Sequence, residues 1–487
     1  MDSNLRRISA CLILLVLTGY VSELPAADKP NFLFLFADDQ RDDSISAYGN
    51  SQIDTPHIDS IVDRAFSFNR AYCIGSMHGA VCQPSRAMLM SGRTLYRVPM
   101  DLKKTALMPE TLGNAGYTTF GTGKWHNGQE SFVRAFQQGQ NVFFGGMSDH
   151  TKVPLKDISA DGKVIDKGND NGFSSELFAD AAIGFLKSAP DDKPFFAYVS
   201  FTSPHDPRQP PKEYVEKYYN NLPPLPDNFM PQHPFFNGWM TGRDEALAAW
   251  PRTPEVVQQQ LAEYYGMITH MDAQIGRILK ALQESGRADN TYVIYTADHG
   301  LAVGSHGLLG KQSVYEHSMG TPLMIAGPGI KRDSSEALVY LLDLFPTITD
   351  LAGVETPKSV EGQSLAPIIK GQKESVRDTL YLTYEKYMRG LTDGRWKLIR
   401  YPHINYTQLF DLENDPSELH NLAEKVEQKS RVDQMMTQLK DWQQQVDDKT
   451  PLTSENPKEM EIDLSGRKRT ADKHQPAWIV EKYFGND

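Results

Sequence analysis

The sequence predicts an α/β fold, with a large mixed, mostly parallel sheet sandwiched by helices and a smaller antiparallel sheet subdomain near the C-terminus. Two observations lead to this prediction. Continuous apolar runs, typical of strands buried on both faces, alternate along the chain with stretches of helical spacing. Near residues 371–378 the pattern changes to alternating polar and apolar residues. At 487 residues the chain is long enough to form a large core.

The predicted elements of the large sheet and its covering helices follow in chain order. The strands are apolar runs bounded by polar or turn residues: 31–37 (NFLFLFA), 116–123 (GYTTFGTG), 193–201 (KPFFAYVSF), 290–297 (NTYVIYTA) and 322–328 (PLMIAGP). The helices have apolar residues three and four positions apart: 58–72, 108–115, 174–189 and 256–286, the last of which ends at Gly286.

Two segments lie outside this alternation. Residues 203–255 are rich in proline, and we expect them to form a long surface insertion that shapes a pocket. Their aromatic and polar residues are candidates for lining it: His233, Trp239, Arg243 and Trp250. Residues 379–415 alternate and turn at Asp393-Gly394, which predicts an antiparallel meander. We therefore predict a main domain over 28–375 and a C-terminal subdomain over 376–487.

The first 27 residues have the order of a secretory signal peptide. Arg6 and Arg7 precede an apolar run from Ile8 to Leu17, and small residues follow at Ala26 and Ala27. The run is too short to span a bilayer, and no other segment resembles a membrane span. We expect residues 1–27 to be removed and the protein to be exported, to the periplasm or out of the cell.

Composition narrows the classes of partner. The formal net charge of −12, without any basic stripe, argues against nucleic acid and suits a protein that binds a hard cation through carboxylates. Beyond the signal only two of the three cysteines remain, Cys73 and Cys82. One interpretation is a disulfide between them, although so small a loop adds little stability.

Four predicted strands run directly into polar residues. Because ligands bind at the carboxyl ends of strands in open α/β sheets, we expect these residues to converge on one rim. They are Asp38 and Asp39, Lys124 and His126, His205 and Asp206, and Asp298 and His299. The carboxylates supply hard oxygen ligands of the kind that suit Ca²⁺ or Mg²⁺, and His299 adds a nitrogen.

Cys82 lies in the stretch GAVCQPSRAMLMSGR, at the start of a predicted helix that Pro84 opens and Gly92 ends. A thiolate nucleophile suits a helix N-terminus, where the dipole favours anions. The expected cation site and the positive side chains around Cys82 suit an anion that carries its charge on several oxygens.

These residues carry a resemblance to a known family. Cys82-Gln83-Pro84-Ser85-Arg86, continuing to Ser91-Gly92-Arg93, resembles the Cys-x-Pro-Ser-Arg signature of type I sulfatases, in the alkaline phosphatase superfamily. Similar segments follow in the family's order over nearly the whole mature chain: Ala37-Asp38-Asp39, Gly123-Lys124-Trp125-His126, Pro204-His205, Asp298-His299-Gly300, Gly310-Lys311, Pro346-Thr347, Gly362-x-Ser364-Leu365, Leu409-Phe410-Asp411-Leu412 and Asp415-Pro416.

The resemblance implies hydrolysis of a sulfate ester, on a sulfated carbohydrate or polysaccharide. In this family a formylglycine-generating enzyme oxidises the cysteine to formylglycine, whose hydrate is the nucleophile. One geminal hydroxyl attacks sulfur, and the other later expels sulfate and regenerates the aldehyde. The resemblance also implies one divalent cation, with Ca²⁺ favoured over Mg²⁺, bound by Asp38, Asp39, Asp298, His299 and the modified Cys82.

The remaining roles are likewise implied by the resemblance. Arg86 would stabilise the formylglycine hydroxyls, and Lys124 and Lys311 would hold sulfate oxygens. His205 would protonate the leaving alcohol, and His126 would assist collapse of the hydrate. The chain departs from many relatives in two places. It has His299 where many relatives have Asn, although iduronate-2-sulfatase-like members also have an Asp-His pair here. It has Gly320-Thr321-Pro322 where relatives often have Arg-Val-Pro.

Two alternative functions remain open from the sequence. A phosphonate monoester or phosphodiester hydrolase of the same superfamily would use the same nucleophile and metal. A non-catalytic protein that binds sulfated glycans would need none of the predicted catalytic positions, yet all of them are present in the chain.

Overall fold

The computed structural model describes residues 29–169 and 172–485. The expected signal peptide, residues 1–27, lies outside the described residues. Among the helices of the described part, none is both long and apolar enough to cross a membrane.

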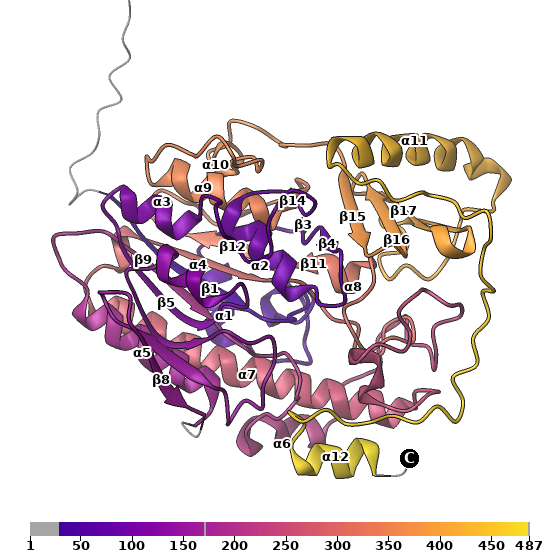
Figure 1. Ribbon diagram of the computed structural model, residues 1–487, viewed down its shortest axis with the longest axis horizontal. Coiled ribbons are helices and arrows are strands. Elements are labelled where there is room, and N and C mark those ends of the chain that lie inside the picture. Colours follow the sequence, from indigo (N-terminus) through magenta and orange to yellow (C-terminus); the bar gives the residue numbers. More distant parts are fainter. Residues whose placement is uncertain (1–28, 170–171, 486–487) are drawn as a thin grey trace, which may run out of the picture.

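A large mixed sheet, whose strands β1, β5, β9 and β12 are labelled in the left half of Figure 1, organises most of the described chain. Its ten strands have the order β13-β2-β12-β10-β1-β9-β5-β6-β7-β8. The five middle strands, from β10 to β6, run parallel. Antiparallel pairing adds β12 and β2 on one side and β7 and β8 on the other, and β13 pairs with β2 in parallel. The strands are β1 (Asn31–Ala37), β2 (Ala65–Phe68), β5 (Thr118–Lys124), β6 (Gln138–Phe143), β7 (Leu155–Ile158), β8 (Val164–Gly168), β9 (Phe195–Ser200), β10 (Thr291–Ala297), β12 (Leu323–Ala326) and β13 (Asp333–Ser335).

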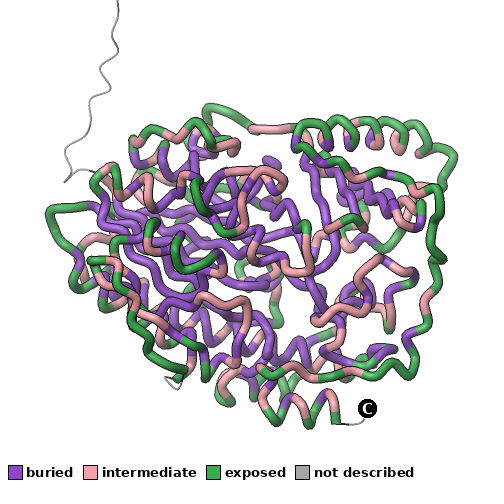
Figure 2. The backbone as a smooth tube through the Cα atoms, in the orientation of Figure 1, coloured by how far each residue is buried: buried purple, intermediate pink, exposed green. Residues whose placement is uncertain are grey.

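The strand β1 shows why the middle strands are apolar throughout. Side chains alternate between the two faces of a strand, and in β1 both faces are buried. Phe32, Phe34 and Phe36 pack into one hydrophobic core, while Leu33 and Leu35 pack into another on the opposite face. The predicted mostly parallel sheet between helices is therefore confirmed, and Figure 2 shows the buried centre that results.

Helices cover both faces of this sheet. One core contains residues of α2 (Cys82–Ser91), α3 (Met108–Asn114), α4 (Gln129–Ala135) and α9 (Leu344–Leu351). The other contains residues of α1 (Pro56–Val62), α5 (Ser174–Ser188) and α7 (Pro254–Glu284). Shorter helices lie in the connections: α6 (Lys212–Asn220), α8 (Glu316–Met319) and α10 (Ala366–Ile369).

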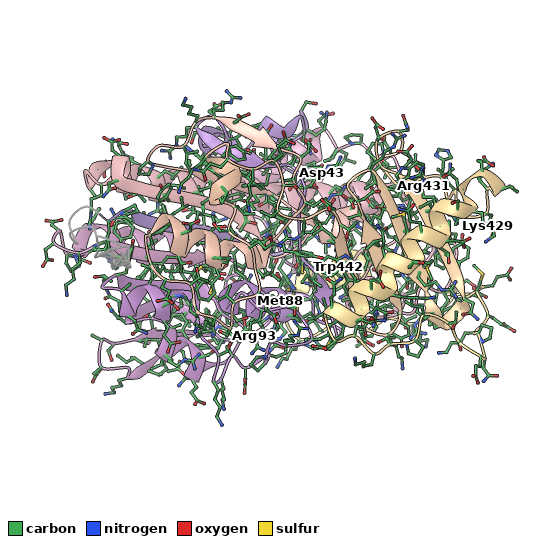
Figure 3. All side chains as sticks on the ribbon, turned by 90° about the horizontal axis from the view of Figure 1, so that it is seen from above. Asp43, Met88, Arg93, Lys429, Arg431 and Trp442 are labelled. Atoms are coloured by element: carbon green, nitrogen blue, oxygen red, sulfur yellow. The ribbon has the colours of Figure 1, made fainter. Side chains whose placement is uncertain are left out.

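The smaller sheet contains the predicted antiparallel meander: β15 (Leu380–Tyr384), β16 (Met388–Thr392), β17 (Trp396–Tyr401) and β18 (Tyr406–Asp411). A strand from far earlier in the chain, β4 (Gly75–Ser76), pairs with β15 in parallel. Three short strands form a separate small sheet: β3 (Ala71–Tyr72), β11 (Gly320–Thr321) and β14 (Val339–Tyr340). The helix α11 (Lys429–Gln445) covers the meander and runs from Lys429 at the far edge of the molecule to Trp442 near its middle (Figure 3).

The end of the chain returns to the first half of the molecule. After α11 it runs along one edge and ends in α12 (Ala477–Phe484), below α6 (Figure 1). Lys482 Nζ and the Tyr483 hydroxyl each donate to Glu263 Oε1 of α7 over 2.8 Å, which holds α12 in place. We call residues 458–484 the C-terminal strap.

Two expectations from the sequence differ from the structure. The helix predicted over 58–72 ends at Val62, because the residues that follow pair with β12 and β13 as β2 and with β11 and β14 as β3. Residues 203–255 are not a surface insertion throughout, since His233 and Trp250 are only 1% and 7% exposed. The strap covers part of this segment, where Leu464 packs with Met240 and Trp250, whereas His233 packs against Phe235 and Tyr315.

Candidate active site

The polar residues at the ends of β1, β10 and β5 meet at one rim of the large sheet. Asp38 and Asp39 follow β1, Asp298 and His299 follow β10, and Lys124 is the last residue of β5. The backbone amides of Asp38 and Asp298 donate to the carbonyls of Ser203 and Ala37 over 3.0 and 3.3 Å. These backbone hydrogen bonds fix the positions from which the two side chains project. All five side chains are fully or almost fully buried.

Cys82 lies at the centre of this rim as the first residue of α2. Its Sγ is 3.2 Å from His299 Nε2, 3.3 Å from Lys311 Nζ and 3.6 Å from Asp39 Oδ1. The helix ends where predicted, at Gly92, whose φ of 63° favours glycine. Cys73 and Cys82 are both free in the described chain, so the interpretation as a disulfide is wrong. Burial raises the pKa of the Cys82 thiol well above its ordinary value.

The carboxylates and nitrogens around Cys82 fit a divalent cation. Ligand atoms of Asp39, Cys82 and His299 lie within 4.8 Å of one another, and so do those of Asp38, Cys82 and Asp298. Asp38 Oδ1 is buried and has no hydrogen-bond donor among the described residues, although Arg86 lies 3.4 Å away. His299 Nδ1 donates to the Gly300 carbonyl over 2.9 Å, which directs the lone pair of Nε2 towards Cys82 and Asp39.

Three positive side chains balance the three carboxylates. Lys124 Nζ donates to Asp38 Oδ2 over 2.5 Å, and Lys311 Nζ donates to both oxygens of Asp39 over 2.8 and 2.9 Å. Arg86 donates from Nε to Asp298 over 3.2 Å. These ion pairs are almost fully buried, where charges interact more strongly than in water.

The pKa values of Asp38 and Asp39 reflect the competition between burial and the neighbouring positive charges. Burial would raise the pKa of Asp38, but the neighbouring ammonium of Lys124 and the guanidinium of Arg86 hold it below its ordinary value. Burial raises the pKa of Asp39 to about 6, although Lys311 acts in the opposite direction. The positive groups of the chain therefore stabilise the ionised carboxylate of Asp38 more than that of Asp39.

A cavity of about 330 Å³ opens above the thiol. Among the residues that line it are the predicted Cys82, His126, His205 and Lys311, whereas the other predicted site residues are buried and do not line it. His205 Nε2 is 2.9 Å from Lys311 Nζ, and His205 Nδ1 donates to the Asp206 carbonyl over 2.7 Å. Burial, reinforced by nearby lysines, lowers the pKa of both histidines well below the ordinary value.

The cavity wall includes residues that sequence reasoning only partly identified. Trp239 and Arg243 line it as expected, whereas His233 and Trp250 pack elsewhere. Sequence reasoning missed several lining residues: Gly79, Ala80, Gly146, Met147, Asp244 and Gln312. Two of them could have been found because each follows a candidate residue directly in the sequence: Asp244 follows Arg243, and Gln312 follows Lys311.

The sequence also resembles proteins of known name. The N-acetylglucosamine-6-O-sulfatase of Bacteroides thetaiotaomicron is 26% identical over 87% of this chain and 88% of its own length. The arylsulfatase of Clostridium perfringens is 28% identical over 83% of this chain and 92% of its own length.

Solved structures share the fold. One described as a complex with its substrate D-glucosamine-2-N,6-O-disulfate has a TM-score of 0.75 at 24% identity and covers 88% of this chain and 100% of its own. The phosphonate monoester hydrolase of Silicibacter pomeroyi has a TM-score of 0.68 at 23% identity and covers 87% and 96%.

Family models match most of the chain. The model for the C-terminal part of N-sulphoglucosamine sulphohydrolase matches residues 304–445, and the sulfatase model matches residues 30–354, which include the whole rim around Cys82. The chain therefore belongs to the sulfatase family, whose members hydrolyse sulfuric esters.

Proposed function

We propose that this sulfatase hydrolyses a sulfate ester on a sulfated carbohydrate or polysaccharide, with a formylglycine derived from Cys82 as its nucleophile. One observation carries the proposal: Cys82 lies at the floor of the cavity, where the acidic rim and Lys311 meet. The substrate class is supported by the carbohydrate sulfatases among the relatives. Conversion of the thiol by a formylglycine-generating enzyme would supply an aldehyde hydrate at this position.

The acidic residues of the rim would hold one Ca²⁺ ion. Asp38, Asp39, Asp298 and His299 surround Cys82 and present mainly hard oxygen ligands, which suit Ca²⁺ or Mg²⁺. The bound ion would lower the pKa of the nucleophile and neutralise sulfate oxygens.

The positive side chains would bind the sulfate group. Lys311 Nζ lies 3.3 Å from Cys82 Sγ and 2.9 Å from His205 Nε2, so it faces both the reacting atom and the cavity. Lys124 and Arg86 hold the carboxylates of the rim, and their buried charge stabilises negative charge that develops on sulfate oxygens.

The two histidines would move protons. His205 lines the cavity and its Nδ1 donates to the Asp206 carbonyl, so in its imidazolium form the second proton, on Nε2, would be the one given to the oxygen of the leaving alcohol. His126 also lines the cavity, and its Nδ1 has no partner among the described residues, so it is available to take a proton as the hydrate collapses.

A phosphonate monoester or phosphodiester hydrolase is the second candidate. It is favoured by the shared fold of the phosphonate monoester hydrolase from Silicibacter pomeroyi. A non-catalytic binding protein is disfavoured, because the predicted catalytic side chains are all present and gathered around one cavity.

The decisive experiment combines mass spectrometry with substrate competition. We expect the peptide that carries Cys82, from protein made in its native host, to contain formylglycine. We expect the protein to release sulfate from sulfated oligosaccharides faster than it cleaves matched phosphate or phosphonate esters. An intact thiol in fully active protein would contradict the nucleophile, and a preference for phosphorus esters would favour the second candidate.

We also propose that the mature protein is exported. The order of basic, apolar and small residues in 1–27 supports a cleaved signal peptide and a periplasmic or secreted location. Fractionation of the native host, with N-terminal sequencing of the purified protein, tests this. Enzyme found in the cytoplasm with its N-terminus intact would contradict it.

A further inference from the structure

The C-terminal strap lies beyond both family matches, which end at residues 354 and 445, yet it contacts the segment that forms part of the active-site wall. The Phe236 amide donates to the Met460 carbonyl over 2.6 Å, and Gln232 Nε2 donates to the Ile462 carbonyl over 3.0 Å. Leu464 is 1% exposed and packs in a small core beside Met240 and Trp250. The strap thus covers the same segment that supplies Trp239 and Arg243 to the cavity.

Two side chains of the strap reach the groups behind the cavity. Asp472 Oδ2 accepts from Arg243 Nε over 3.0 Å. Gln475, which is 8% exposed, donates from Nε2 to Asp206 Oδ2 over 3.1 Å. Arg243 in turn donates to both oxygens of Asp206 and to Asp244. The strap therefore completes a charged network around the buried carboxylate of Asp206.

Asp206 connects this network to the proposed acid. Its Oδ1 is 3.2 Å from His205 Nδ1, and its carbonyl accepts from the same nitrogen over 2.7 Å. The opposite nitrogen, Nε2, faces Lys311 and the cavity. An imidazole can donate along a fixed direction only while its other nitrogen is held, so the position of Asp206 sets the direction in which His205 presents its proton.

We propose that Gln475 and Asp472 are positioning residues for catalysis, which fix the Asp206–Arg243 pair and through it the imidazole of His205. The inference rests on the proposed function only in assigning proton donation to His205. In that step the bond between sulfur and the leaving oxygen breaks, and its electron pair stays on the oxygen. Because His205 Nδ1 already uses its proton to donate to the Asp206 carbonyl, the acid in this step is the imidazolium form of His205: its Nε2 proton moves to the leaving oxygen, which yields a neutral alcohol and a neutral imidazole that keeps its Nδ1 proton.

The test compares two leaving groups. A sugar alcohol is a poor leaving group that needs the proton, whereas 4-nitrophenolate leaves without it. The variant Gln475→Met keeps the length and volume of the side chain but removes the donor to Asp206. We expect kcat/KM to fall roughly tenfold on the best sulfated sugar, mainly through kcat, with little change on 4-nitrophenyl sulfate.

Two further variants grade the effect. Gln475→Glu has the same shape but places a second carboxylate against Asp206, so we expect a larger loss on the sugar ester than with Gln475→Met. Asp472→Asn should cost less, because the side chains of Arg243 and Asp472 are 34% and 25% exposed and solvent screens their ion pair. The control Glu461→Gln removes an exposed carboxylate from the same strap and should leave both substrates unaffected.

The outcomes separate the inference from the proposed function. Equal losses on both esters in Gln475→Met, or no loss on either, would overturn the positioning role, and thermal melting would show whether the fold is retained. His205→Ala, measured on the same two esters, tests the acid itself. This variant must lose activity on the sugar ester and largely keep activity on the aryl ester. If the wild-type protein cleaves only phosphorus esters, sulfate ester hydrolysis fails as the function. The same comparison of variants on alkyl and aryl phosphorus esters then decides the role of the strap.

Discussion

Replacing Gly79 by alanine should disturb the wall of the active-site cavity without touching the reacting groups. An added Cβ would lie 2.8 Å from Cζ2 of Trp239, about 0.6 Å short of the 3.4 Å at which ordinary contact begins. The backbone cannot readily retreat, because Gln312 Nε2 and the Tyr384 hydroxyl donate to the Gly79 carbonyl over 3.2 and 3.3 Å. The indole of Trp239 therefore has to move, and it forms part of the cavity wall.

The size of the effect follows from the cost of overpacking. Forcing one extra methyl group into a packed site costs about 1–3 kcal/mol, which corresponds to a loss of roughly 5- to 150-fold in kcat/KM if the strain is relieved only when the substrate is absent. We expect this loss on a sulfated sugar, mainly as a higher KM, and a smaller loss on 4-nitrophenyl sulfate. Steady-state kinetics on both esters, with thermal melting of each variant, measure it.

A matched control is available in α5. An added Cβ at Gly184 has nothing within 4 Å, so Gly184→Ala should leave the kinetics unchanged and stabilise the helix by up to about 1 kcal/mol. Unaltered kinetics of Gly79→Ala on the sugar ester, in a folded protein, would refute the conclusion that Trp239 forms a wall against which the substrate binds.

Three other predictions concern the site and its surroundings. Cys82→Ala should abolish sulfate release while the melting temperature stays near that of the wild type, and retained full activity would refute the nucleophile. Removing divalent cations with a chelator should abolish activity and lower the melting temperature, and Ca²⁺ should restore both better than Mg²⁺; activity that survives complete chelation would refute the metal site. Burial would raise the pKa of Asp206, but Arg243 outweighs it and lowers this pKa from 3.8 to about 2. A lowered pKa contributes stability above the ordinary value, so Asp206→Asn should cost about 2 kcal/mol at neutral pH. The difference between the unfolding free energies of variant and wild type should vanish as the pH falls from about 4 to about 2, and a difference independent of pH would contradict the assignment.

The central strands could be predicted from the sequence because their signal is local. β1, β9 and β10 are buried on both faces, and this requires continuous apolar runs that the sequence displays directly. The edges of the sheet carry no such signal. β2 forms through pairing with β12 and β13, which lie more than 250 residues later, so its residues suggested the continuation of a helix.

The same distinction holds for the site. Residues that follow directly from strand ends, such as Asp38 and Asp298, could be placed together because parallel strands deliver their ends to one edge. Gln475 could not be placed beside Asp206, since they are 269 positions apart and no sequence pattern links them. His233 and Trp250 are residue types that often line pockets, and only their packing shows that they are core: His233 lies against Phe235 and Tyr315, and Trp250 against Leu464 of the strap.

The burial of Cys82 determines whether its proposed modification comes before or after the chain folds. In the folded chain the thiol is 2% exposed, and its neighbours Ser85 and Arg86 are each 1% exposed within α2. A second enzyme that has to recognise and oxidise this stretch cannot reach it once the helix has docked against the sheet. The proposed conversion must therefore occur on the nascent or unfolded polypeptide, and a chain that folds first would be locked permanently in an inactive form. Slowing the folding of this protein during expression should then raise the fraction of active molecules.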